Sequence, residues 1–393
     1  MPILGTADQD SSNRKDLINI RWSTFLTLVS LLVGSAAYSQ TAPELEYDAV
    51  APLRLPPDLY LGEAAGVAVN SHGHIFVYSR TGSEATLIGP RAASLYEFAP
   101  DGTFVREIGG NLYLKAWAHA VRIDSKDNIW LIDNGSSMAA KLSPSGRVLQ
   151  VFGRRPESTH ARYPRCQGPH CPPHSLRPPY YETADTPPPA ARDGLFDEVT
   201  DVAFDPDGNV YFSDGYNNAR VAKYDTDGNW ITSWGERGSE PGQFRVPHGI
   251  AADDQGRIYV ADRSNNRIQV FESDGTFVQQ ITLADLRRQA PLPADYAPNI
   301  PSFGQLPDGS YNSLWPNSIC ITPGPDPVMF TQDMFPGRIY KMSLDGTVLG
   351  YLGRDGQAIG QFGWIHGLAC PSANELYIAE LLTWRVQKVT IRD

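Results

Sequence analysis

An all-β, six-bladed β-propeller closed by a strand from the N-terminal end is the fold that this sequence predicts. Three observations support it: a unit of about 40 residues recurs along the chain, each complete unit holds four short strands, and the last unit lacks its fourth strand. The 35 Gly and 32 Pro residues suit short strands that are joined by tight turns.

The repeat is clearest when residues 199–216 are compared with residues 244–263. Each segment holds an apolar strand, a Gly-containing turn and a second strand of alternating apolar residues, and a third strand then begins with arginine. Asp-Gly pairs follow the third strand at residues 101–102, 227–228, 274–275 and 345–346. Asp-Gly between alternating strands predicts type I′ hairpin turns.

The units number six, and their inner strands are expected to begin near Glu63, Trp117, Val199, Val246, Trp315 and Trp364. The sixth unit has room for only three strands before the chain ends, so residues 46–55 are expected to supply the missing outer strand and cover its edge. We therefore assign residues 41–393 to one propeller, with Pro-rich surface loops at about 154–192 and 284–311.

Residues 1–40 have the pattern of a secretory signal peptide. Arg14, Lys15 and Arg21 precede an apolar run, residues 22–33, and small residues follow at 34–37. The apolar run is shorter than a membrane span, which needs about 20 residues. The alternative is that the segment is an uncleaved membrane anchor. We expect an exported protein, periplasmic or secreted, with no stable membrane partner.

Charge and cysteine content narrow the partners further. The net charge of −11 and the lack of a basic cluster exclude a nucleic-acid partner. We expect a monomer that binds a small molecule or peptide with a carboxylate. Cys166 and Cys171 share one Pro-rich loop with two histidines, which favours a local disulfide over a second metal site. Cys320 and Cys370 fall at similar places in consecutive repeats and are either a disulfide or buried thiols.

Histidine stands at the start of the inner strand in blades two, four and six, as His119, His248 and His366. The equivalent positions of the other blades hold Ala65, Thr200 and Asn317. Alternate blades are a third of a turn apart, so the three imidazoles are expected to converge on the axis. Three histidines with an open fourth position are the ligand set of a catalytic zinc. The alternative is that they are architectural.

Three more residues are expected on the same face, because each follows the second strand of its blade. Arg80, Tyr216 and Arg263 occupy this position in blades one, three and four. The alternative for the two arginines is a surface salt bridge. A second arginine set recurs at one point of the unit and is expected to brace neighbouring strands: Arg220, Arg267 and Arg385.

The repeat resembles the NHL family of propellers, through Gly-Gln-Phe before the inner strand, Ala-Asp-Arg and Asn-Asn-Arg-Ile. Together with the histidines and the Arg–Tyr–Arg set, it resembles the peptidyl-α-hydroxyglycine α-amidating lyases. The resemblance implies zinc on His119, His248 and His366, and catalysis by Arg80, Tyr216 and Arg263. Arg80 would hold a substrate carboxylate, and Tyr216 would take the hydroxyl proton as the C–N bond breaks to give an amide and glyoxylate.

Two departures qualify the resemblance. The family has Asp directly after the third zinc histidine, where it helps to bind a structural calcium, and Gly367 here argues against that ion. The family's disulfide next to the catalytic tyrosine is absent, because Asn217 follows Tyr216. A related metal-dependent hydrolase or lyase on another small substrate, and a non-catalytic NHL binding platform, are the alternative functions.

Overall fold

A computed structural model describes residues 41–81, 92–153, 191–293, 315–334 and 337–392. The first three blades, each given from the inner to the outer strand, are β2 (Glu63–Val69), β3 (Ile75–Arg80), β4 (Ala93–Phe98) and β5 (Phe104–Ile108); β6 (Ala118–Ile123), β7 (Ile129–Asp133), β8 (Met138–Leu142) and β9 (Val148–Gly153); and β10 (Val199–Phe204), β11 (Val210–Asp214), β12 (Arg220–Tyr224) and β13 (Trp230–Trp234).

The other three blades follow the same order. They are β14 (Pro247–Ala252), β15 (Ile258–Asp262), β16 (Arg267–Phe271) and β17 (Phe277–Thr282); β18 (Ile319–Ile321), β19 (Met329–Gln332), β20 (Ile339–Met342) and β21 (Val348–Leu352); and β22 (Ile365–Ser372), β23 (Glu375–Glu380), β24 (Arg385–Ile391) and β1 (Tyr47–Val50).

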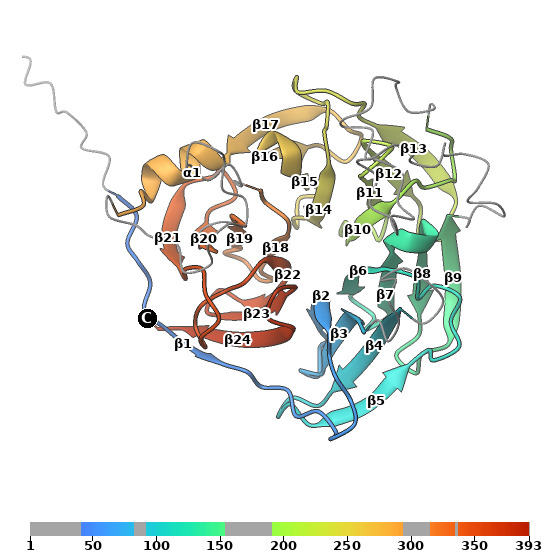
Figure 1. Cartoon of the computed structure of the whole chain (residues 1–393). Helices are drawn as coiled ribbons and strands as arrows, with labels where there is room; N and C mark the ends of the chain where they lie inside the picture. The colour runs from blue at the N-terminus through green and yellow to red at the C-terminus, as the bar shows by residue number, and fades with distance from the viewer. Residues whose placement is uncertain (1–40, 82–91, 154–190, 294–314, 335–336, 393) are drawn as a thin grey trace, which may run out of the picture. The chain divides into compact units, whose positions relative to one another are not determined.

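The six sheets surround a central axis, with β2, β6, β10, β14, β18 and β22 nearest to it (Figure 1). Each of these inner strands contacts the next, and β22 contacts β2 to complete the ring. The predicted six-bladed propeller is therefore confirmed. The fifth inner strand begins at Ile319 rather than near Trp315. The segment between them turns toward neighbouring blades, where the side-chain amide of Asn317 donates to the Ile365 carbonyl.

The N-terminal segment closes the ring as expected. β1 pairs antiparallel with β24, with Tyr47 opposite Ile391. The same segment also reaches both neighbouring blades, since the Leu45 amide donates to Tyr351 at 2.8 Å and the Arg54 amide donates to Gly102 at 2.8 Å. It therefore covers sheet edges of blades five, six and one.

The predicted type I′ turns are wrong. In each Asp-Gly pair only the glycine has a positive φ, for example +85° at Gly228 and +93° at Gly275. The Gly228 amide donates to Asp225 and the Asp225 amide donates to Asn229, so the loop is longer than the two residues of a type I′ hairpin. The strand pairing shifts by a residue beside the turn, as in a hairpin that ends in a glycine bulge.

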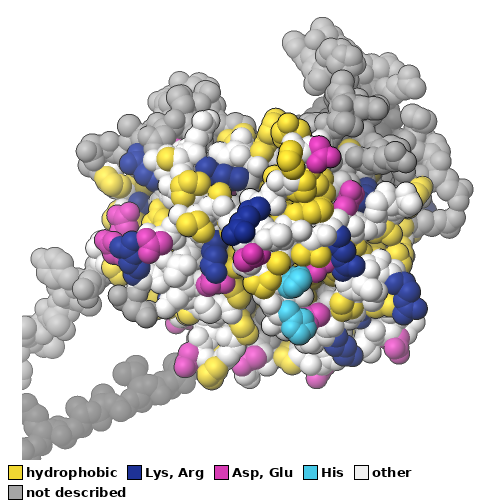
Figure 2. Space-filling view, turned by 90° about the horizontal axis from the view of Figure 1, so that it is seen from below, with side chains coloured by type: hydrophobic (Ala, Val, Ile, Leu, Met, Phe, Trp, Pro, Cys, Tyr) yellow, Lys and Arg dark blue, Asp and Glu magenta, His cyan; other side chains and the backbone are white. Residues whose placement is uncertain are grey.

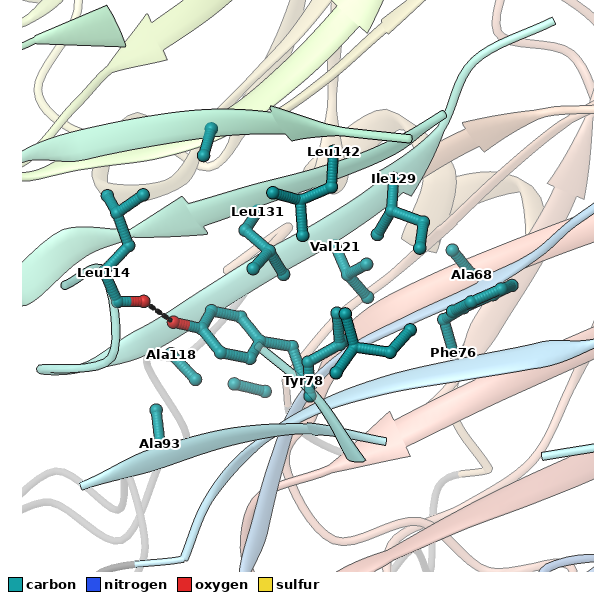
Figure 3. Packing of buried hydrophobic residues seen from close by; sticks show 14 of the residues in the cluster. Ala68, Phe76, Tyr78, Ala93, Leu114, Ala118, Val121, Ile129, Leu131 and Leu142 are labelled. Carbon is teal, nitrogen blue, oxygen red and sulfur yellow. Dashed lines mark hydrogen bonds between the residues drawn. The ribbon is translucent and has the colours of Figure 1, made fainter. Parts of the chain in front are cut away.

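Apolar side chains fill the space between neighbouring blades. Figure 3 shows the cluster between blades one and two, where Phe76 and Tyr78 pack against Val121 and Leu131. The Tyr78 hydroxyl donates to the Leu114 carbonyl at 2.7 Å, which pairs its polar end inside the core. The predicted arginine braces are also confirmed as ion pairs: Arg220–Asp214, Arg267–Asp262 and Arg385–Glu380.

The second predicted insertion begins with helix α1 (Leu283–Gln289) rather than a loop. The Thr282 hydroxyl caps it by accepting from the Asp285 amide at 3.1 Å, and Leu283 and Leu286 are buried. Residues 294–314, residues 154–190 with Cys166 and Cys171, and the predicted signal peptide lie outside the described residues. No helix in the described part of the chain is long and apolar enough to cross a membrane.

Cys320 and Cys370 form a disulfide between β18 and β22, with their Cα atoms 6.0 Å apart. The bond joins blades five and six at their inner strands, whereas β1 covers the outer edge of blade six. The sequence left open either a disulfide or two buried thiols, and the structure contains the disulfide.

Replacing both cysteines with serine is expected to lower the free energy of unfolding by about 2–4 kcal/mol, because the bond closes a segment of 50 residues in the unfolded chain. Urea denaturation of the Cys320→Ser/Cys370→Ser variant beside the wild type measures the loss. Equal midpoints under non-reducing conditions would show that the bond does not constrain the unfolded chain.

Candidate metal centre

His119, His248 and His366 come together on the propeller axis from β6, β14 and β22. Their ring centroids are 4.6, 4.8 and 5.0 Å apart, and one nitrogen of each lies within 4.8 Å of the others. All three side chains are buried. The convergence predicted from their repeat positions is present in the structure, as a group that could hold a metal ion.

An irregularity in the inner strands aims these side chains. Strand pairing shifts by a residue in five of the six inner strands, at the point where each histidine or its equivalent lies. His119 is the unpaired residue between Ala118 and Ala120, both of which pair with residues of β7. A β-bulge of this kind re-aims one side chain without ending the sheet. The sequence pattern did not predict the bulges.

Each imidazole is held by the blade that follows it. The Nδ1 atoms of His119, His248 and His366 lie 2.5, 2.7 and 2.6 Å from backbone carbonyls. The acceptors are the equivalent residues of the alternate blades, Thr200, Asn317 and Ala65. A carbonyl only accepts, so Nδ1 carries the proton and the Nε2 lone pair remains for a metal.

The surroundings keep the histidines neutral. Burial, followed by the neighbouring histidines and Arg80, holds the pKa of His119 well below 6.5. Burial and then the charge of Arg263 do the same to the pKa of His248. Burial and Arg80 lower the pKa of His366 to about 3. Neutral imidazole is the form that binds a metal, so protons do not compete for this site near neutral pH.

Tyr216 and Arg263 lie beside the histidines, as predicted. The Tyr216 hydroxyl is 3.1 Å from Nε2 of His248 and 3.3 Å from Nε2 of His119. The Arg263 guanidinium donates to that hydroxyl at 3.4 Å and lies over the Trp315 ring at 4.7 Å. Its Nε atom is buried without a hydrogen-bond partner among the described residues.

Arg80 lies next to this site through Ala118, the residue before His119, and its charge lowers the pKa of all three histidines. Its Nε donates to the Ala118 carbonyl at 2.9 Å, and its Nη1 pairs with Glu63 at 3.0 Å. The guanidinium lies over the Trp117 ring at 4.3 Å. Glu63 was missed by the sequence reasoning, although it stands directly opposite Arg80 across β2 and β3.

Two histidine side chains lie next to each other on the face that Figure 2 shows. Basic and acidic side chains are interspersed there with hydrophobic ones, rather than gathered into a field of one sign.

Comparison with known proteins agrees with the propeller fold and identifies relatives of this chain. The NHL repeat family pattern matches residues 244–271. Peptidyl-glycine α-amidating monooxygenase A of Xenopus laevis is 32% identical over 239 residues, which cover 58% of this chain and 21% of the relative. A probable peptidyl-α-hydroxyglycine α-amidating lyase of Caenorhabditis elegans is 24% identical over 236 residues, covering 55% of this chain and 57% of the relative.

The matched region thus spans about a fifth of the first relative and little more than half of the second. Among solved structures, virginiamycin B lyase of Staphylococcus aureus has a TM-score of 0.51 at 14% identity, covering 88% of this chain and 100% of that one. This likeness concerns the fold alone. The curated relatives confirm the resemblance to NHL and amidating proteins and support an enzymatic role.

Proposed function

We propose that this chain, an NHL-repeat propeller with amidating enzymes among its relatives, is a zinc-dependent carbon–nitrogen lyase. The observation that carries the proposal is the set of three imidazoles that meet on the axis, with the Tyr216 hydroxyl against two of them and Arg263 bonded to that hydroxyl, while Arg80 binds the carbonyl of the residue before His119. The substrate is a peptidyl-α-hydroxyglycine or a similar carbinolamide, and the products are an amide and glyoxylate. A binding platform has no need of this combination.

The donor set fits zinc. His119, His248 and His366 would supply three nitrogen ligands, with the carbonyls on Nδ1 fixing the ring orientations. Three protein ligands leave the open position of a catalytic rather than a structural site. When bound, zinc would supply the positive charge that stabilises negative charge on the substrate hydroxyl oxygen.

The side chains around the histidines suit the proton and charge movements of this cleavage. The Tyr216 oxygen accepts the proton of the substrate hydroxyl, whose electrons form the carbonyl of glyoxylate. The electrons of the breaking C–N bond pass to nitrogen, which takes up the proton that Tyr216 received, so that the amide forms and the tyrosine oxygen regains its negative charge. Arg263, within hydrogen-bond distance of Tyr216, stabilises negative charge on the tyrosine oxygen.

Arg80 is proposed to hold the substrate carboxylate, because a planar guanidinium binds a carboxylate through two charge-assisted hydrogen bonds. Its pairing with Glu63 keeps it in place before substrate arrives, and the substrate carboxylate would then share that guanidinium. Holding the carboxylate through two hydrogen bonds orients the substrate carbon whose bond to nitrogen is cleaved.

Arg80→Ala is expected to raise KM and lower kcat for a carboxylate substrate, each by about tenfold or more, because neutral groups cannot replace a charge-assisted bond. Product release is measured with two substrates, benzoyl-α-hydroxyglycine and its methyl ester. The acid releases glyoxylate, and the ester releases methyl glyoxylate. The ester is expected to respond little. Equal losses on both substrates would make Arg80 a structural residue and remove the carboxylate assignment.

We also propose that the protein acts outside the cytoplasm. The signal pattern of residues 1–40 motivates this location. The Cys320–Cys370 disulfide supports it independently, because such bonds persist in oxidising compartments.

A further inference from the structure

The layer of residues directly after the histidine positions differs between the blades. These six positions hold Gly66, Ala120, Asp201, Gly249, Ser318 and Gly367. Five of them are small and uncharged, and Asp201 of blade three carries the only charge among the six. The resemblance to the amidating lyases implies a carboxylate in blade six instead, at Gly367, as a ligand of calcium. Here the carboxylate stands three blades away.

A side chain at Gly367 would be crowded by the neighbouring backbone. A Cβ atom there would lie 3.0 Å from the Cα of Gly66 and 3.2 Å from the Ala65 carbonyl oxygen, because β22 and β2 pass each other closely. The residues present in blade six therefore do not fit a calcium site of the implied kind.

A guanidinium group occupies this level of the channel. Arg122 of β6 donates from Nε and Nη2 to the two carboxylate oxygens of Asp201, at 2.9 and 2.5 Å. Its Nη1 donates to the backbone carbonyl of Leu368 at 3.0 Å. The side chains of Arg122 and Asp201 are 15% and 4% exposed, so this is a largely buried, bidentate ion pair.

The ion pair connects all three strands that carry the histidines. Arg122 lies on β6 with His119, and the carbonyl it binds belongs to Leu368, on β22 with His366. The carboxylate of Asp201 also accepts from the amide of Ile250, on β14 with His248, at 3.3 Å.

Asp201 is connected to the histidines in a second way, through its own strand. It directly follows Thr200, whose carbonyl fixes the His119 ring. Through these contacts, the Arg122–Asp201 pair is connected to backbone that lies within three residues of each proposed metal ligand.

Arg122 contributes to two cavities along the inner strands. Arg122 and Asp201 line a small cavity of about 10 Å³ together with the three histidines. Arg122 also borders a second cavity of about 320 Å³, whose walls include Val67, Ile123 and Val202. The pair therefore forms part of the wall of the histidine site.

We propose that the Arg122–Asp201 ion pair takes the place of a structural calcium and positions the three metal ligands. This inference rests on the proposed metal site. Arg122 and Asp201 are positioning residues: they hold the three backbone segments in register and touch neither the metal nor the substrate. The fold then needs no second metal ion at this level.

The test compares the purified Arg122→Ala variant with the wild type and with Arg257→Ala. Arg257 is a matched control, because it pairs with the buried carboxylate of Asp253 at 2.8 Å in the turn between β14 and β15, at the other end of β14 from His248. Zinc affinity is measured by competition with a chromogenic chelator, and Tm is measured with and without millimolar calcium.

Arg122→Ala is expected to weaken zinc binding by about 10–100-fold, the usual cost of losing an outer-shell partner. Both alanine variants are expected to lower Tm by roughly 5–10 °C, since each leaves a buried carboxylate unpaired. Only Arg122→Ala is expected to change the zinc affinity, and calcium is expected to leave the wild-type Tm unchanged.

Wild-type protein that binds no zinc would remove the proposed metal site itself. Zinc affinity that is equal in wild type and Arg122→Ala would overturn the positioning role, as would a calcium-dependent rise in wild-type Tm. Should Arg122→Ala fail to fold, Arg122→Lys decides: it keeps the charge but cannot span both Asp201 and Leu368, so weaker zinc binding is expected, and unchanged affinity contradicts the inference.

Discussion

Replacing His248 with alanine is expected to reduce bound zinc from about one ion per molecule to nearly none, and to abolish turnover with it. The structure gives the site three nitrogen ligands, and an ion that loses one of three protein ligands is weakly held. His248 also lies 3.1 Å from the Tyr216 hydroxyl, so the substitution removes a ligand and a neighbour of the proposed base. Metal analysis by mass spectrometry, with glyoxylate release measured in parallel, quantifies both losses.

His74→Ala is the matched control, because His74 pairs with Glu97 at 2.8 Å and is not one of the three clustered histidines. That variant is expected to keep its zinc and its activity. Equal and near-zero metal in wild type and His248→Ala, after growth with zinc, would remove the metal site.

Tyr216→Phe is expected to keep the fold and the zinc but to lose about 10²–10⁴-fold in kcat, the usual contribution of a general base. Phenylalanine preserves the ring that lies edge-on to His119 and His248 and removes only the hydroxyl. Arg263 would then lose its contact with that hydroxyl while it stays over the Trp315 ring. Steady-state kinetics and metal content of the purified variant measure the effect.

Tyr211→Phe serves as the control, since the Tyr211 hydroxyl donates to Asp205 at 2.7 Å within blade three and is not in contact with the three histidines. It is expected to keep normal turnover. A Tyr216→Phe enzyme with near-normal turnover would place the base elsewhere and would favour a metal-dependent hydrolase over the lyase.

Much of the fold and the centre of the site could be predicted because a repeat converts sequence position into spatial position. Once each inner strand was located, His119, His248 and His366 had to lie at one level on alternate blades. The same reasoning correctly placed Tyr216 and Arg263 beside them. Closure by β1 followed from the missing strand of the last blade.

The remaining features depend on contacts between blades, which a repeat pattern does not encode. The carbonyls that fix the imidazoles and the Arg122–Asp201 pair each join one blade to another. The bulges that aim the histidines depend on the pairing register, which a single residue shifts. The turn type was wrong because Asp-Gly suits both a two-residue turn and a longer loop that ends in a bulged glycine.

Glyoxylate release from an α-hydroxyglycine substrate by zinc-loaded and by chelator-treated protein tests the central claim most directly. Benzoyl-α-hydroxyglycine is a suitable substrate, and benzamide is the second product to be measured. The account predicts equal amounts of glyoxylate and benzamide from the loaded protein, loss of both after chelation, and recovery when zinc is returned. Loaded protein that carries one zinc per molecule yet releases neither product above the uncatalysed rate would contradict the lyase assignment.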